Sequence, residues 1–285
     1  MRRGAAATAQ DDPLSATLLI PAAPGQERAP LVLLHGFTGD AGTWAMLVAA
    51  LSERPDFGRA VWAVDLVGHG RSPRPGAAAA HAIPAQAEAV AATLAARGVD
   101  RAVWLGYSMG GRVALTRAAQ APQSVAGLIL VGASPGIADA QARAARAAAD
   151  ERLAAAIEQD GLAAFVDRWA VMPIFASQAR LGPRHAARMR RQRLRNDPVA
   201  LATSLRHAGQ GVMPPLLDAL PGLRVPTLLV AGAMDEKYRA LARDMADALP
   251  DGEVALVAEA GHAVQLEAPA ALAGLVATWL ARRAP

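Results

Sequence analysis

Gly106-Tyr107-Ser108-Met109-Gly110 is the stretch that decides how this chain folds. It closes the apolar run Ala102 to Gly106 and opens an Ala-rich segment with helical periodicity over residues 109–120. A serine between two glycines at such a strand-to-helix junction is typical of a sharp turn, because the glycines let the backbone bend tightly and expose the hydroxyl. The N–H that follows the serine then faces the position where an oxyanion would develop. We therefore expect Ser108 to act as a nucleophile or as a serine-linked base.

A second copy of this pattern, Gly132-Ala133-Ser134-Pro135-Gly136, provides an internal comparison. It also follows an apolar run, but the residue after its serine is a proline, which has no N–H to donate to an oxyanion. We interpret this copy as a turn at the end of a strand, so Ser108 remains the candidate.

Short apolar runs bounded by Gly, Pro or Asp recur along the chain, and Ala-rich segments with helical periodicity separate them. Near-continuous hydrophobicity is typical of strands that are buried on both faces of a mostly parallel sheet. The alternation of strands and helices therefore predicts a doubly wound α/β fold. The expected strands are Leu31 to Leu34, Ala60 to Asp65, Ala102 to Gly106, Gly127 to Val131, Thr227 to Ala231 and Glu253 to Ala258. The expected helices are 43–53, 83–98, 109–120, 236–248 and 268–283.

The alternation breaks over residues 134–212, which we call the lid segment. It contains Ala-rich and Arg-rich helical pattern and no convincing strand, and it is too long for a loop in a compact domain. Pro173, Pro183 and Pro198 divide it into several helices. The sequence thus predicts a disordered tail at 1–14, a core formed by 15–133 and 213–285, and an inserted helical lid at 134–212.

The composition excludes several classes of protein. The chain has 285 residues, of which 53% are apolar, and it has no cysteine. The lack of thiols rules out disulfide scaffolds, thiolate metal sites, Fe–S clusters and cysteine nucleophiles. Aromatic residues make up only 4%, so stacking platforms for nucleic acid are scarce. We expect no metal, no cofactor and no nucleic-acid partner.

The N-terminus begins with Met1-Arg2-Arg3, but the apolar run that follows is shorter than a secretory signal requires. No stretch of the chain is apolar over the length that a membrane helix needs. We therefore predict a cytoplasmic protein with no membrane partner.

A serine of this kind needs an imidazole to take its proton and a carboxylate to orient the imidazole. Asp235 and His262 each lie just past an expected strand, so both belong to the sheet edge where α/β folds build their sites. The chain order Ser, Asp, His matches that of α/β-hydrolases. In that fold the turn after an early strand gives one oxyanion N–H and the residue after the serine gives the other, which we assign to Phe37 and Met109.

These elements together resemble an α/β-hydrolase-fold enzyme with a helical lid inserted after the sixth strand of the sheet. A narrower resemblance rests on four stretches, two of them around Phe37 and Ser108. The stretches are 35–40, 106–112, Trp169 with Pro173-Ile174-Phe175-Ala176-Ser177, and 235–242. They are similar to the 2-succinyl-6-hydroxy-2,4-cyclohexadiene-1-carboxylate synthases of menaquinone biosynthesis, and the similarity includes the lid segment.

The resemblance implies a lyase. Members of this family remove a proton from 2-succinyl-5-enolpyruvyl-6-hydroxy-3-cyclohexene-1-carboxylate and expel pyruvate, with the triad acting as a base. Carried over by position, Ser108 relayed by His262 accepts the proton, Asp235 orients His262, and the amides of Phe37 and Met109 stabilise the enolate. Five further residues match substrate-binding positions of the family: Tyr107, Arg112, Arg146, Trp169 and Arg193.

The charge distribution favours an anionic substrate. The lid segment holds 12 of the 29 basic residues and 7 of the 25 acidic ones, a net of +5, so the rest of the chain has a net of −1. Lys237 is the one lysine among the basic residues. Arginine forks bind carboxylates in a bidentate manner, and the family's substrate carries three. By contrast, Arg184, Arg188, Arg191 and Arg195 recur at helical spacing and predict a solvated helix face.

Two other functions remain open at this stage. The same triad would serve an esterase or a C–C bond hydrolase that uses Ser108 covalently. A neutral ester, however, would not need Arg112, Arg146 and Arg193 at one pocket. A binding module without activity is disfavoured because the triad and the oxyanion turn are all present.

Overall fold

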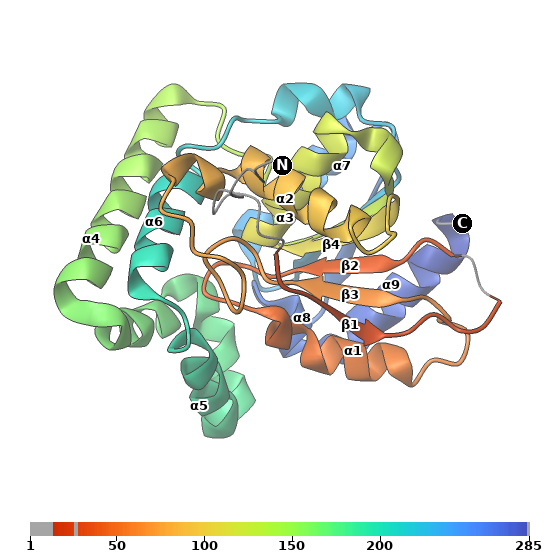
Figure 1. The fold of residues 1–285 in the computed structure, drawn as a ribbon, viewed down its shortest axis with the longest axis horizontal. Coiled ribbons are helices and arrows are strands. Elements are labelled where there is room, and N and C mark those ends of the chain that lie inside the picture. The colour runs from red at the N-terminus through yellow and green to blue at the C-terminus, as the bar shows by residue number, and fades with distance from the viewer. Residues whose placement is uncertain (1–13, 26–27, 284–285) are drawn as a thin grey trace, which may run out of the picture.

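The computed structural model describes residues 14–25 and 28–283, and they form one seven-stranded sheet with helices on both faces (Figure 1). The strand order is β1-β3-β2-β4-β5-β6-β7, and every neighbouring pair is parallel except β1 with β3. The strands are β1 (Ala16–Ile20), β2 (Leu31–Leu34), β3 (Val61–Val64), β4 (Ala102–Tyr107), β5 (Val125–Val131), β6 (Thr227–Gly232) and β7 (Gly252–Val257).

Two hydrophobic cores lie between the sheet and its helices. One core includes residues of α2 (Ile83–Ala95), α3 (Met109–Gln120) and α7 (Glu236–Ala248). The other includes residues of α1 (Ala45–Ser52) and α9 (Pro269–Arg283). Because both faces are covered, β2, β4 and β5 are buried along their whole length, which is why they are continuously apolar. The predicted α/β-hydrolase architecture, with its alternating strands and helices, is confirmed.

The sequence did not indicate β1 or α8 (Val264–Glu267). The strand β1 lies at the sheet edge, where its residues are only half-buried, so it lacks the strong apolar signal of the central strands. The helix α8 is a single turn, which is too short to show periodicity. Five short 3₁₀ segments complete the described chain: η1 (Ala41–Trp44), η2 (Ala78–His81), η3 (Pro122–Ser124), η4 (Pro173–Leu181) and η5 (Leu217–Gly222).

The lid segment contains α4 (Ala140–Ala170), α5 (Gly182–Arg193) and α6 (Pro198–Ala208), which lie together at one end of the sheet (Figure 1). It connects β5 to β6. The expected position after the sixth strand is therefore wrong, because only five strands of the described chain precede it. The lid has its own small core, which includes Phe165 and Leu201.

The predicted tail at 1–14 lies outside the described residues except for Leu14. This leucine is buried, and its amide donates a hydrogen bond to Thr93 Oγ1 at 2.9 Å. The domain boundaries at 133/134 and 212/213 stay a prediction. Among the described helices, none has the length and apolar character to cross a membrane.

Candidate active site

Ser108 occupies the turn between β4 and α3 with φ 51° and ψ −108°, a left-handed conformation that is strained for a residue with a side chain. The surrounding glycines make this turn possible. A Cβ on Gly106 would clash with the backbone of Gly110, and a Cβ on Gly110 would clash with the carbonyl of Leu34. Close backbone approach therefore requires glycine at both flanks of the serine, as the motif predicted.

The structure brings Ser108, His262 and Asp235 together. His262 Nδ1 lies 2.8 Å from Asp235 Oδ2, and His262 Nε2 lies 3.3 Å from Ser108 Oγ. Since a carboxylate only accepts, Nδ1 carries the proton and Nε2 is free to accept from the serine hydroxyl. Asp235 also caps α7 by accepting from the amide of Tyr238 at 3.2 Å, which fixes the carboxylate.

The loop that carries His262 is fixed by Glu267, a residue that the sequence did not single out. Its side chain is fully buried. One carboxylate oxygen accepts from the amide of Gly261 at 2.8 Å and the other from the amide of Ala263 at 3.1 Å, on either side of the histidine. Arg180 of the lid segment pairs with the same carboxylate at 3.3 Å. Only tertiary structure reveals this role, because a lone Glu near the end of a chain has no distinctive pattern.

The turn that follows β2 lies beside the serine. A Cβ on Gly36 would lie 2.8 Å from the ring of Tyr107 and 3.4 Å from Ser108 Cβ. The adjacent Phe37 thus brings its backbone close to Ser108. Met109 is the first residue of α3, so its N–H is one of the helix-start donors without an intrahelical partner.

His35 has a structural part in this turn. Its Nδ1 donates to the Gly36 carbonyl at 2.8 Å, and its Nε2 accepts from the amide of Leu66 at 2.9 Å. Burial lowers the pKa of His35, which keeps the ring neutral and suits it to this pair of bonds.

Tyr107, Trp169 and Arg193 gather with Phe37 around a small cavity of about 30 Å³. The Trp169 ring lies 5.4 Å from that of Phe37, and the Arg193 guanidinium lies 5.5 Å from the centre of the Phe175 ring. Arg193 is buried, and burial lowers its pKa. It therefore lies off the exposed arginine stripe, as its position in the helix predicted.

Two glutamines that the sequence did not indicate also line this cavity. They are Gln178 of η4 and Gln265 of α8. Within residues 14–25 and 28–283, neither oxygen nor nitrogen of the Gln265 amide has a hydrogen-bond partner, nor has Gln178 Nε2. Buried amides of this kind are normally satisfied, so these atoms are available to water or to a ligand.

Arg112 and Arg146 belong to a second group. Arg112 is buried, and its Nη1 donates to the Ala208 carbonyl at 2.5 Å. Burial lowers its pKa to about 10. Arg146 is partly exposed and donates to Asp150 Oδ1 at 2.9 Å, so it is engaged within α4. Both cations interact electrostatically with Tyr238, whose ring lies 4.5 Å from that of His262.

The predicted substrate residues thus form two groups. In each group a tyrosine ring lies against the ring of His262. Tyr107 lies 5.3 Å from the histidine ring, centroid to centroid, and Tyr238 lies at 4.5 Å. Burial raises the pKa of both phenols, so both stay neutral. Tyr238 and its partner Gln210, which donates to the phenol oxygen at 3.0 Å, are further residues that the sequence did not assign.

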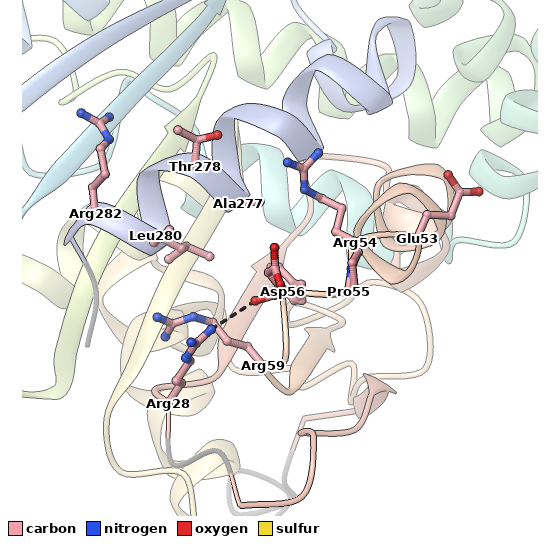
Figure 2. A pocket seen from close by; sticks show the side chains of 12 residues that line it. Arg28, Glu53, Arg54, Pro55, Asp56, Arg59, Ala277, Thr278, Leu280 and Arg282 are labelled. Atoms are coloured by element: carbon pink, nitrogen blue, oxygen red, sulfur yellow. Dashed lines mark hydrogen bonds between the residues drawn. The ribbon is translucent and has the colours of Figure 1, made fainter.

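A larger cavity of about 730 Å³ lies away from this chemistry, between the end of α1 and α9 (Figure 2). Arginines line this cavity, and some of them are already bound by carboxylates or backbone carbonyls. Arg28 donates to the Asp56 carbonyl at 3.2 Å, and Arg282 pairs with Glu253 at 3.1 Å. No triad residue lines this cavity. Its size alone therefore does not make it the active site.

A serine at a strained turn, a histidine and a carboxylate at the ends of parallel strands define an enzyme of the α/β-hydrolase class. The family model for the alpha/beta hydrolase fold matches residues 29–269. A Bacillus subtilis (strain 168) protein named as a candidate 2-succinyl-6-hydroxy-2,4-cyclohexadiene-1-carboxylate synthase is 35% identical over 250 residues, 88% of this chain and 89% of that protein. The synthase of that name from Serratia proteamaculans (strain 568) is 33% identical over 255 residues, 89% of this chain and 94% of that protein.

Among solved structures, MenH from S. aureus superposes with a TM-score of 0.87 at 29% sequence identity, covering 94% of this chain and 98% of that one. The chain therefore belongs to the 2-succinyl-6-hydroxy-2,4-cyclohexadiene-1-carboxylate synthase family of the α/β-hydrolase fold.

Proposed function

We propose that this protein eliminates pyruvate from 2-succinyl-5-enolpyruvyl-6-hydroxy-3-cyclohexene-1-carboxylate, the reaction for which its relatives are named. One observation carries the proposal beyond the family. Arg193 is buried near the triad, and within the described residues it forms no ion pair with a carboxylate. Arg112 is also buried and forms no salt bridge there, although the carboxylate of Asp150 acts on it electrostatically. A buried cation without a counter-ion is costly, so the site is suited to a ligand that brings its own carboxylates.

In this proposal the triad works as a base. His262 Nε2 accepts the Ser108 hydroxyl proton, and the serine oxygen removes a proton from the ring carbon next to the succinyl ketone. Asp235 stabilises the imidazolium that forms and keeps Nδ1 protonated. The electrons of the broken C–H bond move onto the ketone oxygen, where the amides of Phe37 and Met109 stabilise the charge.

Collapse of this enolate expels the leaving group. The electrons return to form a double bond between C2 and C3 of the ring. The existing double bond shifts from C3–C4 to C4–C5, and the C–O bond between C5 and the enolpyruvyl group breaks. The departing enolpyruvate takes up a proton and becomes pyruvate, while the ring becomes 2-succinyl-6-hydroxy-2,4-cyclohexadiene-1-carboxylate. No acyl-enzyme is formed. Ser108 regains its hydroxyl when its oxygen takes the proton from the ring carbon, and the protonated His262 is left as the acid that can protonate the departing group.

The two groups of substrate residues bind different carboxylates of the substrate. We assign Arg193, with Tyr107 and Trp169, to one end of the tricarboxylate, and Arg112 to the other end through the Tyr238 side of the site. Each charge-assisted contact contributes about 1.5–3 kcal/mol. Arg146 requires a change of partner to join them, because Asp150 already holds it.

The test is to supply the enolpyruvyl cyclohexene substrate to the purified protein and to follow pyruvate release. We expect pyruvate and the cyclohexadiene product in equal amounts. Ser108→Ala should abolish turnover, and Ser134→Ala is the matched control, because Ser134 sits in the second Gly-x-Ser-x-Gly stretch. Turnover of p-nitrophenyl esters without any pyruvate would establish the hydrolase alternative instead. The cytoplasmic location stays a prediction.

A further inference from the structure

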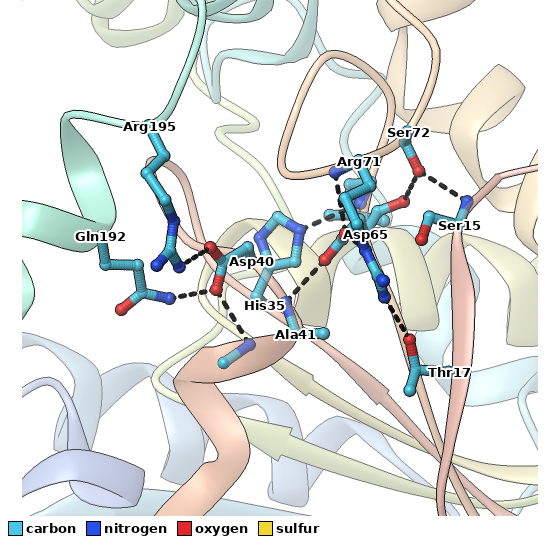
Figure 3. Close-up of polar contacts among 12 residues, drawn as sticks. Ser15, Thr17, His35, Asp40, Ala41, Asp65, Arg71, Ser72, Gln192 and Arg195 are labelled. Atoms are coloured by element: carbon cyan, nitrogen blue, oxygen red, sulfur yellow. Dashed lines mark hydrogen bonds and ion pairs between the residues drawn. The ribbon is translucent and has the colours of Figure 1, made fainter.

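The lid segment is fastened to the loop that carries the oxyanion turn, and Asp40 is the centre of this contact (Figure 3). Asp40 Oδ2 accepts from Arg195 Nη2 at 2.6 Å, and Asp40 Oδ1 accepts from Gln192 Nε2 at 2.5 Å. The same Oδ1 also accepts from the amide of Gly42 at 2.8 Å and so caps η1. One carboxylate therefore joins the end of α5 to the loop after β2.

A third lid residue, which directly follows Arg195, also contacts this loop. Asn196 Nδ2 donates to the Thr38 carbonyl at 3.0 Å, and it is buried. Thr38 has φ 67°, a left-handed conformation that a β-branched residue adopts only when its surroundings enforce it. The lid thus contacts Thr38 and Asp40, two of the three residues that directly follow Phe37.

The other side of the loop is fixed by the core as well as by the lid, since Gln192 Nε2 also donates to Thr43 Oγ1 at 3.0 Å. Asp65 Oδ1 accepts from the amide of Ala41 at 2.6 Å, and Asp65 Oδ2 accepts from the amide of Arg71 at 2.9 Å (Figure 3). Asp65 therefore holds residue 41 whether the lid is docked or not. Within residues 36–40, the lid adds contacts to Thr38 and Asp40, while His35 of the core holds the Gly36 carbonyl.

Arg193 lies in the same stretch of the lid, between Gln192 and Asn196. Any movement that separates Gln192 and Arg195 from Asp40 also carries the Arg193 guanidinium away from the cavity that Phe37 and Tyr107 line. A movement of this stretch of the lid therefore changes both the position of Arg193 at the cavity and the contacts of the oxyanion turn.

We propose that Asp40 is a positioning residue for the oxyanion hole, through which the docked lid sets the geometry of the Phe37 amide. The proposal rests on the assignment of Phe37 and Arg193 to the pyruvate elimination. A substrate whose carboxylate engages Arg193 stabilises the docked lid, and the docked lid in turn completes the oxyanion hole. This arrangement favours a carboxylate-bearing substrate in the chemical step as well as in binding.

Three variants test the contact, and kcat and KM for pyruvate release are measured separately for each. Asp40→Asn retains an oxygen for the cap but loses the charge, and we expect kcat to fall about tenfold or more. Arg195→Ala removes an exposed partner, and we expect a smaller fall of about two- to fivefold. Arg195→Lys should restore most of it. The double variant Asp40→Asn/Arg195→Ala should be no slower than Asp40→Asn, because both changes break one contact.

The matched control is Arg190→Ala. Arg190 lies on the same helix and pairs with Asp167 at 2.7 Å, but both partners belong to the lid segment and are solvent-exposed. We expect kcat and KM to stay at the wild-type values. A fall in kcat as large as that of Arg195→Ala would show that loss of any α5 ion pair has the same effect, and would overturn the proposal.

Amide hydrogen exchange of residues 36–40 in the ligand-free protein gives a readout that does not depend on turnover. Arg195→Ala and Asp40→Asn should accelerate exchange in this stretch, while Arg190→Ala should not. Unchanged exchange in Asp40→Asn would overturn the proposal even if kcat fell. If the wild-type protein releases no pyruvate but the exchange results are as expected, the assigned reaction is wrong and the lid-to-loop coupling stands.

Discussion

The ring of Tyr238 lies 4.5 Å from the ring of His262, centroid to centroid, at an interplanar angle of 52°. Tyr238 therefore packs against the imidazole of His262. Its hydroxyl, which accepts from Gln210, points to the group that contains Arg112. The two functions of the side chain can be separated by substitution, because the ring supports the histidine and the hydroxyl contacts the second group.

Tyr238→Phe keeps the ring and removes the hydroxyl. We expect kcat to stay within about threefold of the wild type, because one neutral hydrogen bond is worth about 1 kcal/mol or less. Tyr238→Ala removes the ring, and we expect a fall in kcat of at least about tenfold together with a loss of stability of about 3–5 kcal/mol. Steady-state kinetics and urea unfolding check both values. Equal kinetic losses in the two variants would show that the hydroxyl, and not the ring, is what matters.

Glu267→Gln replaces a carboxylate that accepts from the amides of Gly261 and Ala263. A glutamine presents one N–H₂ group to these donors, so one hydrogen bond is lost and a buried amide is left unpaired. We expect a loss of about 1–3 kcal/mol in the free energy of unfolding and a lower kcat, since the His262 loop loses one of its two supports. Glu253→Gln is the control, because that carboxylate pairs with arginines of α9 far from the triad. An unchanged kcat in Glu267→Gln would show that the loop needs no such support.

Arg193→Met tests whether the buried guanidinium binds the substrate. Methionine preserves much of the apolar contact with Phe175, so the main loss is the charge. We expect KM to rise by about tenfold to a hundredfold, the equivalent of one charge-assisted contact. Arg191→Met, two residues away on the exposed stripe, should leave KM unchanged. A rise in KM of the same size in both variants would point to the overall charge of the lid instead of a specific contact.

Buried histidines should make the protein sensitive to acid. Burial lowers the pKa of His69 to about 3, and it also lowers the pKa of His35 and His81. The folded state therefore binds fewer protons than the unfolded state below the ordinary histidine value of 6.5, so stability falls as the pH drops through that value toward 3. Each such histidine contributes a slope of up to about 1.4 kcal/mol per pH unit.

His69→Asn should remove the contribution of one histidine, up to about 1.4 kcal/mol per pH unit, from the pH dependence of the free energy of unfolding. The free energy of unfolding is measured in urea at several pH values between 7.5 and 4.5, and the slopes of the variant and the wild type are compared, so a general loss of stability in the variant does not affect the result. His207→Asn, a histidine for which burial is incomplete, is the control. Identical slopes for His69→Asn and the wild type would mean that this ring does not take part in the acid response.

The alternation of strands and helices, and the sheet edge at which Ser108, Asp235 and His262 meet, could be predicted from the sequence, because each depends on local patterns. Strands buried on both faces are continuously apolar, and the Ser108 turn requires glycines at fixed positions. The partners of the lid arginines could not be predicted in this way. Arg195 belongs to the stripe expected to be solvated, and its side chain is indeed 65% exposed, yet it contacts Asp40, 155 residues earlier.

Arg146 and Gln265 also show what the sequence could not predict. The sequence suggested a role for Arg146 that its ion pair opposes, and it suggested no role for Gln265. Arg146 carries a charge that the family resemblance assigns to the substrate, but a carboxylate one helical turn away already pairs with it. Gln265 belongs to no motif. It is notable because its amide is buried and has no hydrogen-bond partner within the part of the chain that the structure describes. Both facts depend on which surfaces meet after the lid packs on the core, which periodicity and spacing do not determine.

The cavity of about 30 Å³ beside Phe37 and Arg193 is too small for the assigned substrate. Such a space holds about one or two water molecules, whereas the six-membered ring with its succinyl and enolpyruvyl arms is many times larger. We therefore expect the lid and the loop after β2 to move apart when the substrate enters, and the Asp40–Arg195 contact to break and form again during turnover. Asp40–Arg195 is suited to repeated opening because one of its partners is exposed. When the lid moves away, water can replace the hydrogen bonds of the pair at little cost in free energy.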